Sequence, residues 1–281
     1  MDIACLENCL TESECQTFEE NGFLIVEDAL SPKIVENLTA AVDRLDSEYR
    51  STKELSPYDR LHMLDFVAKD VQFFDLIDWY KTFPKVWGIL GWHIQLYLSH
   101  MDVTPPKNPK EKLTKKRLGL HQDSGRLNKD LETIPRPRIS VKVAYFLSDT
   151  SVEGQGNFHV VPKSHLKNEI VFPEDGVSNP SGTTPICVLP GTAVIFDRRI
   201  WHGPSPNHSE ITRKVLFYSY RWLRPRDNVE ASRFMDTCSP IRKQLLGATS
   251  VGGHGYTSPK DEDVPLRDWI KDHLGEEAVM P

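Results

Sequence analysis

Hydrophobic spacing in the first ninety residues indicates helices interrupted by one short strand. Apolar residues recur every three or four positions over about 31–50, which is typical of an amphipathic helix. A capping-box pattern begins a shorter helix at Thr11, Gly22 ends it, and the apolar run 23–26 follows as a strand. The aromatic-rich stretch 70–90 is predicted to be a third helix that packs in the core.

After residue 92 the pattern changes to short β-type runs separated by Pro and Gly. Runs of this length with this punctuation predict an antiparallel sandwich or barrel rather than alternating strands and helices. A polar, irregular stretch follows residue 224 and ends in an amphipathic segment at 264–274. The predicted strands are 93–101, 117–123, 138–147, 157–162, 185–190, 192–197 and 214–223.

We expect a single domain over residues 1–281, mainly β with α. Residues 1–90 are expected to form helical support, 91–224 the β core, and 225–281 a C-terminal tail or lid. Length alone would also permit two domains. One domain is favoured because the candidate site residues described below are spread along the β-rich region and have to converge.

The charge balance excludes several kinds of partner. The chain carries 34 Lys and Arg against 40 Asp and Glu, a net charge of −6, so its overall field does not attract nucleic acid or an anionic membrane. Its acidic start lacks the positive charge of a secretory signal, and no apolar run approaches the ~18 residues of a membrane span. Five cysteines without a C-x-x-C pair argue against a disulfide framework or a thiolate zinc site. We therefore expect a cytoplasmic monomer or homodimer that acts on a small molecule.

One basic run, Lys107–Arg117, stands out from this acidic composition. It contains no aromatic residue and follows two prolines, which favours a solvated loop over a polyanion site. If the run has a function, the natural one is to cover an acidic or carboxylate-bearing substrate. Arg126 is a second candidate partner for a substrate carboxylate, although it is equally suited to face solvent or an acidic neighbour.

Three His-x-Asp/Glu pairs each place an imidazole and a carboxylate on one face of a strand, because side chains at i and i+2 point the same way. The pair of His121 and Asp123 ends a strand-like run before a Ser-Gly turn, where a site can open to a ligand. The other two pairs are interpreted as surface polar groups, one at a sheet edge and one in a polar turn: His100 with Asp102, and His208 with Glu210.

Two histidines and one carboxylate on one face of a metal are the ligand set of non-haem Fe(II) oxygenases, which leaves positions open for an oxo acid and dioxygen. His202 is the best candidate for the third ligand, because a turn and a buried strand at 190–197 lead into it. Eleven residues later, Arg213 begins a further strand that returns to the same end of the barrel. Arginine can hold a carboxylate with a bidentate fork, which lysine cannot.

This ordered set of motifs resembles the phytanoyl-CoA dioxygenase family of iron(II)- and 2-oxoglutarate-dependent oxygenases, over about residues 11–224. The resemblance implies a double-stranded β-helix, that is, a cupin-like jelly roll, with N-terminal helices packed on its outside. The motifs that carry it are HQD at 121–123, EGQGNFHVVPKSH at 153–165, LPGTAVIFD at 189–197, WHG at 201–203 and Arg213.

The resemblance also implies roles for single residues. Iron would be held by His121, Asp123 and His202, and Arg213 would bind the distal carboxylate of 2-oxoglutarate. Tyr145 falls where relatives often have a tryptophan beside 2-oxoglutarate.

Three further positions follow from the same comparison of motifs. Gln95 is expected to face the pocket as a cofactor-binding residue, with Tyr97 beside it as a substrate contact. Pro204 stands where relatives often carry a small hydroxyl residue, which puts a cosubstrate hydrogen bond there in doubt. His165 is interpreted as a structural histidine rather than a ligand.

The implied activity is oxidation of a C–H bond of a small metabolite, a polar or amino-acid-derived natural product in biosynthesis, with O2 and 2-oxoglutarate consumed and succinate and CO2 released. Hydroxylation, or demethylation through hydroxylation, is expected, because halogenating relatives replace the carboxylate that Asp123 supplies here. Two alternatives remain open. One is a cupin-like metal-dependent hydrolase or isomerase that uses the same ligands, and the other is a non-catalytic jelly-roll ligand-binding protein.

Overall fold

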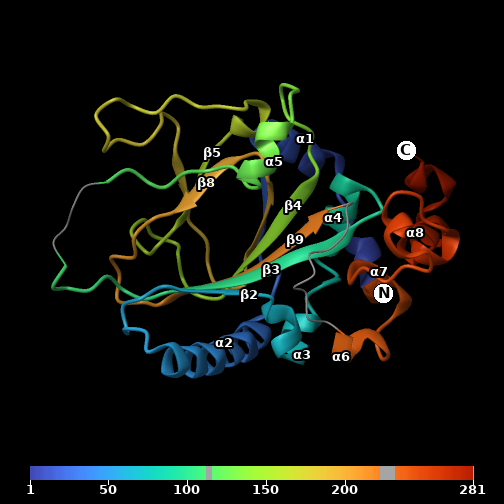
Figure 1. Cartoon of the computed structure of the whole chain (residues 1–281), viewed down its shortest axis with the longest axis horizontal. Helices are drawn as coiled ribbons and strands as arrows, with labels where there is room; N and C mark the ends of the chain where they lie inside the picture. Colours follow the sequence, from blue (N-terminus) through green and yellow to red (C-terminus); the bar gives the residue numbers. More distant parts are fainter. Residues whose placement is uncertain (112–115, 222–231, 281) are drawn as a thin grey trace.

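The computed structural model describes residues 1–111, 116–221 and 232–280. Two antiparallel sheets face each other (Figure 1): a large one with strand order β1-β7-β4-β9-β3-β2, and a small one with order β6-β5-β8. The strands are β1 Phe23–Val26, β2 Leu61–Leu64, β3 Gln95–Thr104, β4 Ser140–Phe146, β5 Phe158–Val161, β6 Thr184–Ile186, β7 Ala193–Asp197, β8 Trp201–Pro204 and β9 Arg213–Arg221.

Strand alternation divides the interior into two hydrophobic clusters. On β4, Ala144 and Phe146 point toward the small sheet, whereas Val143 and Tyr145 point toward the helices. The cluster between the sheets includes Phe158 of β5, and lines the end of the jelly roll where the candidate site lies. The larger cluster joins the opposite face of the large sheet to the helical layer.

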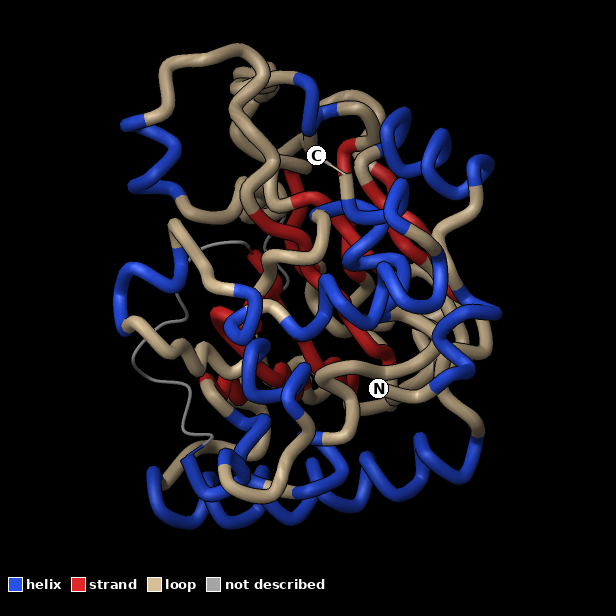
Figure 2. Tube along the Cα trace, turned by 90° about the vertical axis from the view of Figure 1, so that its right-hand side faces the viewer, coloured by secondary structure: helices blue, strands red, loops and turns tan. Residues whose placement is uncertain are grey.

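Helices cover that opposite face of the large sheet (Figures 1 and 2). Two tyrosines of β9 fasten the layers together, because the Tyr218 and Tyr220 hydroxyls donate to the carbonyls of Phe73 and Ile77, each at 2.7 Å. The helices are α1 Glu12–Asn21, α2 Pro32–Lys53, α3 Val71–Phe74, α4 Phe83–Leu90, α5 Gly125–Asp130, α6 Ser232–Met235, α7 Pro240–Leu245 and α8 Pro265–Leu274. Among the residues described, no helix is both long and apolar enough to cross a membrane.

Three local expectations were wrong. The stretch 70–90 forms two helices, α3 and α4, and Pro84 lies in the first turn of α4, where its missing N–H costs nothing. The run 117–123 forms no strand, and only His121 makes an isolated bridge. Beyond residue 231 the tail contains α6 and α7 rather than irregular chain, whereas α8 coincides with the amphipathic segment expected at 264–274. The predicted boundary at 224 lies outside the described residues.

A buried ionic cluster ties the N-terminal helix to the β core. Asp197, at the end of β7, is fully buried and pairs with Arg199 at 2.6 Å and Arg138 at 2.8 Å. Arg138 also pairs with Glu19 of α1 at 2.7 Å. Burial alone would raise the pKa of Asp197, but the two guanidinium groups outweigh it and lower that pKa.

Replacement of Asp197 by Ala is expected to lower the free energy of unfolding by about 3 kcal/mol, because the buried Arg199 loses its counter-ion and Arg138 loses one of its two. Because its pKa is lowered in the folded state, the Asp197 carboxylate stabilises the fold only while it is ionised. The loss of stability caused by the substitution should therefore shrink as pH falls below about 4. Urea unfolding at several pH values measures it, with the exposed Glu169→Gln as control. A loss below 1 kcal/mol at pH 7 would contradict this account.

Candidate active site

Three potential metal ligands converge at one wall of a cavity of about 520 Å³ between the sheets. Asp123 Oδ1 lies 4.0 Å from His121 Nε2 and 3.8 Å from His202 Nε2. His202 belongs to β8, and the other two residues lie in the loop before α5. The ligand atoms all fall within 4.8 Å of one another, so one ion can contact all three.

The backbone holds the two histidines in register. His121 N donates to His202 O, and His202 N donates to His121 O, each at 2.9 Å. Gly203 permits this approach, because a Cβ there would lie 3.0 Å from the carbonyl oxygen of Gly119. The imidazole centroids are consequently only 4.5 Å apart.

Hydrogen bonds at Nδ1 leave each Nε2 free to bind a metal. His202 Nδ1 donates to the Ile200 carbonyl at 2.9 Å, and His121 Nδ1 to the Gly119 carbonyl at 3.2 Å. Carbonyl support of the distal ring nitrogen is the usual arrangement behind a metal-bound histidine. Burial lowers the pKa of His202 to about 4, so its imidazole is neutral near pH 7, as ligation requires.

Lys142 of β4 pairs with the other oxygen of the candidate carboxylate ligand. Its Nζ lies 2.9 Å from Asp123 Oδ2, and both side chains are buried. Burial would raise the pKa of Asp123, but Lys142 and His202 outweigh it and hold that pKa well below its ordinary value. Oδ1 therefore faces the imidazoles while Oδ2 is held by the lysine.

Arg213 lies in the same cavity, 1% exposed, with its Nε and Nη1 donors unpartnered among the described residues. Burial lowers its pKa to about 10, and Asp102 opposes the shift, so the guanidinium stays charged near neutral pH. Gly156, with φ +71°, lets the side chain pass, since a Cβ there would lie 3.1 Å from Arg213 Cδ. A buried, charged donor without a partner fits a carboxylate ligand.

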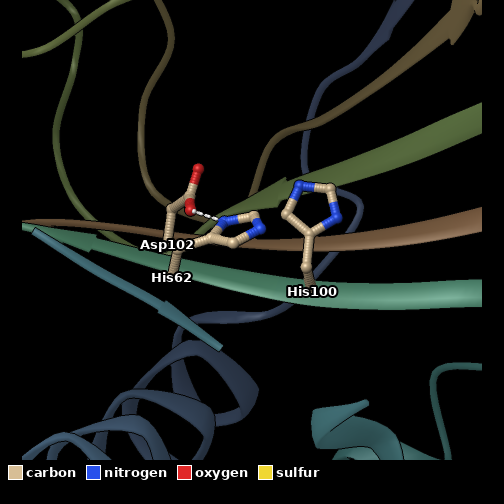
Figure 3. Close-up of side chains that lie close together, drawn as sticks. All are labelled: His62, His100 and Asp102. Atoms are coloured by element: carbon tan, nitrogen blue, oxygen red, sulfur yellow. Dashed lines mark hydrogen bonds and ion pairs between the residues drawn. The ribbon is translucent and has the colours of Figure 1, made fainter. Parts of the chain in front are cut away.

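A second group of polar side chains, shown in Figure 3, lines the same cavity. His62 Nδ1 donates to Asp102 Oδ1 at 2.7 Å, and Arg60 pairs with Asp102 Oδ2 at 2.5 Å. His100 stacks on Phe217 with ring centroids 4.4 Å apart. Because both oxygens of Asp102 already have partners and one is a guanidinium, this group suits a cation poorly.

The interpretation of His100 and Asp102 as surface groups was therefore wrong. They are 9% and 4% exposed, because β2 pairs with β3 and covers that edge of the sheet. The interpretation of His208 and Glu210 as exposed was correct.

A model of the phytanoyl-CoA dioxygenase (PhyH) family matches residues 18–215 of the chain, which include all three potential ligands and Arg213. The chain belongs to the PhyH family. The PhyH family comprises Fe(II)- and 2-oxoglutarate-dependent dioxygenases, so the chain is an oxidoreductase of that class. The donor set described above, two imidazoles and one carboxylate, fits Fe(II) of this kind.

Individual relatives agree with the PhyH assignment. Dioxygenase trt7 of Aspergillus terreus (strain NIH 2624 / FGSC A1156) is 24% identical over 261 residues, which span 85% of this chain and 84% of trt7. HygX from Streptomyces hygroscopicus, solved with nickel and 2-oxoglutarate bound, superposes with a TM-score of 0.58 at 18% identity, over 78% of this chain and 88% of HygX. EctD from S. alaskensis, solved with 2-oxoglutarate and 5-hydroxyectoine, superposes with a TM-score of 0.58 at 17% identity, over 75% and 76% of the two chains. These structures confirm the jelly-roll fold with N-terminal helices.

The remaining predicted site residues do not line the cavity that holds the three potential ligands. Tyr145 points into the helical layer, where its hydroxyl meets that of Thr82, so its expected place beside 2-oxoglutarate is not the one it occupies. Gln95 and Tyr97 are buried at the start of β3, before the residues of that strand that line the cavity, and the Arg221 guanidinium lies over the Tyr97 ring. Arg126 pairs with Asp130 on α5 at 3.4 Å, and its side chain is 82% exposed.

Lys142, Arg60 and His62 line the cavity and were not singled out from the sequence. Lys142 had a readable signal, since it interrupts the apolar run 138–147 at a position that alternates with Ala144. Arg60 and His62 had none, because they reach the cavity only through the pairing of β2 with β3.

Because Tyr145 contacts Thr82 rather than the cavity, Tyr145→Phe should cost about 1 kcal/mol of stability through one lost hydrogen bond. The affinity for 2-oxoglutarate should stay within about twofold of wild type, since a net hydrogen bond to the ligand would cost more. Thermal unfolding and calorimetric titration with 2-oxoglutarate in the presence of Ni(II) measure the two effects. A tenfold weaker 2-oxoglutarate affinity would return Tyr145 to the cofactor site.

Proposed function

We propose that this PhyH-family dioxygenase hydroxylates a C–H bond of a small polar or amino-acid-derived metabolite, or demethylates it through hydroxylation, and releases succinate and CO2. Iron is held by His121, Asp123 and His202, and the distal carboxylate of 2-oxoglutarate by Arg213. The observation that carries this proposal is the joint presence, in one cavity, of the convergent donor set and a buried guanidinium with two free donors.

Bound Fe(II) and 2-oxoglutarate supply the oxidising chemistry. The chain supplies geometry and charge. Both imidazoles are fixed by carbonyls behind them, and Lys142 keeps one carboxylate oxygen of Asp123 away from the metal position. Phe158, Phe196 and Phe217 line the cavity and give it an apolar wall.

A small-molecule substrate suits a cavity of about 520 Å³. That EctD was solved with 5-hydroxyectoine, a hydroxylated small compound by its name, supports hydroxylation as the outcome. A cupin-like hydrolase or isomerase would have no use for a carboxylate-binding Arg213, and the PhyH match makes a non-catalytic binding protein the weaker alternative.

Anaerobic loading with Fe(II), followed by 2-oxoglutarate and oxygen, tests the reaction class directly. Wild type should form succinate and consume oxygen, slowly without substrate and faster with it. Candidate metabolites are then screened for acceleration of succinate formation. Absence of any succinate from the metal-loaded wild type would refute the proposal.

His121→Ala should weaken metal binding by more than the roughly 10–100-fold typical of changes behind a ligand, because a donor itself is removed. His100→Ala should leave metal affinity nearly intact, since Asp102 beside it is engaged by Arg60 and His62. Titration with Ni(II) measures both, with circular dichroism as a check on folding. The reverse order of effects would place the metal at the His62, His100 and Asp102 group.

Arg213→Met should raise the KM for 2-oxoglutarate by about 30-fold or more, because a buried charge-assisted pair contributes at least ~2 kcal/mol. Arg126→Met, which removes an exposed arginine outside the cavity, is the matched control and should leave that KM unchanged. The measurement is succinate formation at varied 2-oxoglutarate. Equal KM values for the two variants would assign the carboxylate to another residue.

A further inference from the structure

A second cavity of about 610 Å³ adjoins the candidate active site. Arg60 and Pro204 line both cavities, so they form the wall where the two meet. The outer cavity is bounded partly by the basic run noted in the sequence, through Lys107, Lys116 and Arg117, while 112–115 lie outside the described residues. The inner and outer cavities together can take a molecule larger than the inner one alone.

Arg60 is fixed at this shared wall and retains free donors. Its Nη2 pairs with Asp102, which is 4% exposed and therefore a rigid anchor. The Arg60 side chain is 44% exposed, and Asp102 is the ion partner that the described part of the chain gives it. Since a guanidinium has five N–H donors in a planar fork, most of them remain available to a ligand.

The inner cavity carries one positive charge beyond what its own carboxylates balance. Arg60, Lys142 and Arg213 face Asp102 and Asp123. Fe(II) would add two positive charges and 2-oxoglutarate would remove two, so the excess of one remains. A cation in a partly desolvated site favours an anionic partner.

The lining of the outer cavity also has a net positive charge. Even without the shared Arg60, already counted in the inner cavity, its cations Lys107, Lys116 and Arg117 exceed its acids Asp59 and Glu111 by one, although the whole chain is acidic. Lys107 is held in place, because its backbone N–H donates to the Asn207 carbonyl at 2.9 Å.

Three residues that line these cavities each have a buried polar atom without a partner among the described residues. Thr104 Oγ1 and Ser205 Oγ in the outer wall, and His100 Nδ1 in the inner wall, are buried and make no hydrogen bond among the described residues. Such atoms are costly unless a ligand or water satisfies them.

We propose that the substrate carries an anionic group, a carboxylate or a phosphate, and that Arg60 recognises this group at the wall between the two cavities. This assignment rests on the proposed function, because it takes iron and 2-oxoglutarate to occupy the inner cavity. Arg60 is thereby a specificity-determining residue: it holds the charged end of the substrate and leaves the remainder to reach toward His121 and His202.

The test uses matched probes with one apolar body: 4-phenylbutyrate, its methyl ester, and 3-phenylpropyl phosphate. Each is titrated calorimetrically into enzyme loaded with Ni(II) and saturating 2-oxoglutarate, the pair bound in the HygX structure, so that Arg213 is already occupied. Wild type should bind at least one of the two anions about tenfold more tightly than the ester. The tighter anion identifies the charged group as carboxylate or phosphate.

Arg60→Met and Arg60→Gln should both abolish this preference, and the second keeps a hydrogen-bond donor near Asp102 in case the first unfolds. Lys110→Met, an exposed lysine outside both cavities, should preserve the preference. Equal binding of anions and ester by wild type, including no binding of any probe, would overturn the assignment. A preference that survives in both Arg60 variants would also overturn it. Succinate formation by wild type is scored separately, so a failure of the dioxygenase proposal is distinguishable from a failure at Arg60.

Discussion

Two reciprocal backbone hydrogen bonds, between His121 and His202, are the constraint on which the candidate active site depends. They join a loop that has no strand of its own to β8, and they set two imidazoles side by side at the end of the jelly roll. Asp123 follows two residues later, its backbone N–H held by the Arg198 carbonyl at 2.9 Å. A facial set of donors therefore arises from main-chain pairing rather than from the side chains themselves.

Charge compensation is the second organising feature of the cavity. Each buried carboxylate there has a cation within ion-pair distance: Lys142 for Asp123, and Arg60 for Asp102. Arg213 differs from Lys142 and Arg60, because it forms no such ion pair and two of its donors have no partner among the described residues. The protein thus stabilises its own carboxylates internally, and Arg213 is the buried guanidinium that we propose holds 2-oxoglutarate, which the family uses.

The sequence predicted the features that depend on local spacing or on ordered motifs. A capping-box pattern marked the start of α1, and the series of short runs indicated an antiparallel sandwich or barrel. The ordered motifs then pointed, by resemblance, to a jelly roll, which the solved relatives confirm. Features that depend on pairing between distant strands could not be read in this way. His100 and Asp102 were interpreted as exposed because nothing near them in the sequence predicts that β2 pairs with their strand. Tyr145 was expected beside 2-oxoglutarate but lies on the helical side, because counting between motifs does not fix which side of β4 a residue occupies.

The central claim is that Fe(II) and 2-oxoglutarate bind together at His121, Asp123, His202 and Arg213. Its most direct test is an anaerobic absorption titration, because a keto acid that chelates Fe(II) through its keto and carboxylate oxygens gives a weak visible charge-transfer band. The band should appear only when both Fe(II) and 2-oxoglutarate are present, saturate at one iron per chain, and be lost in His202→Ala. A missing band in saturated wild type, or an undiminished band in His202→Ala, would contradict the account.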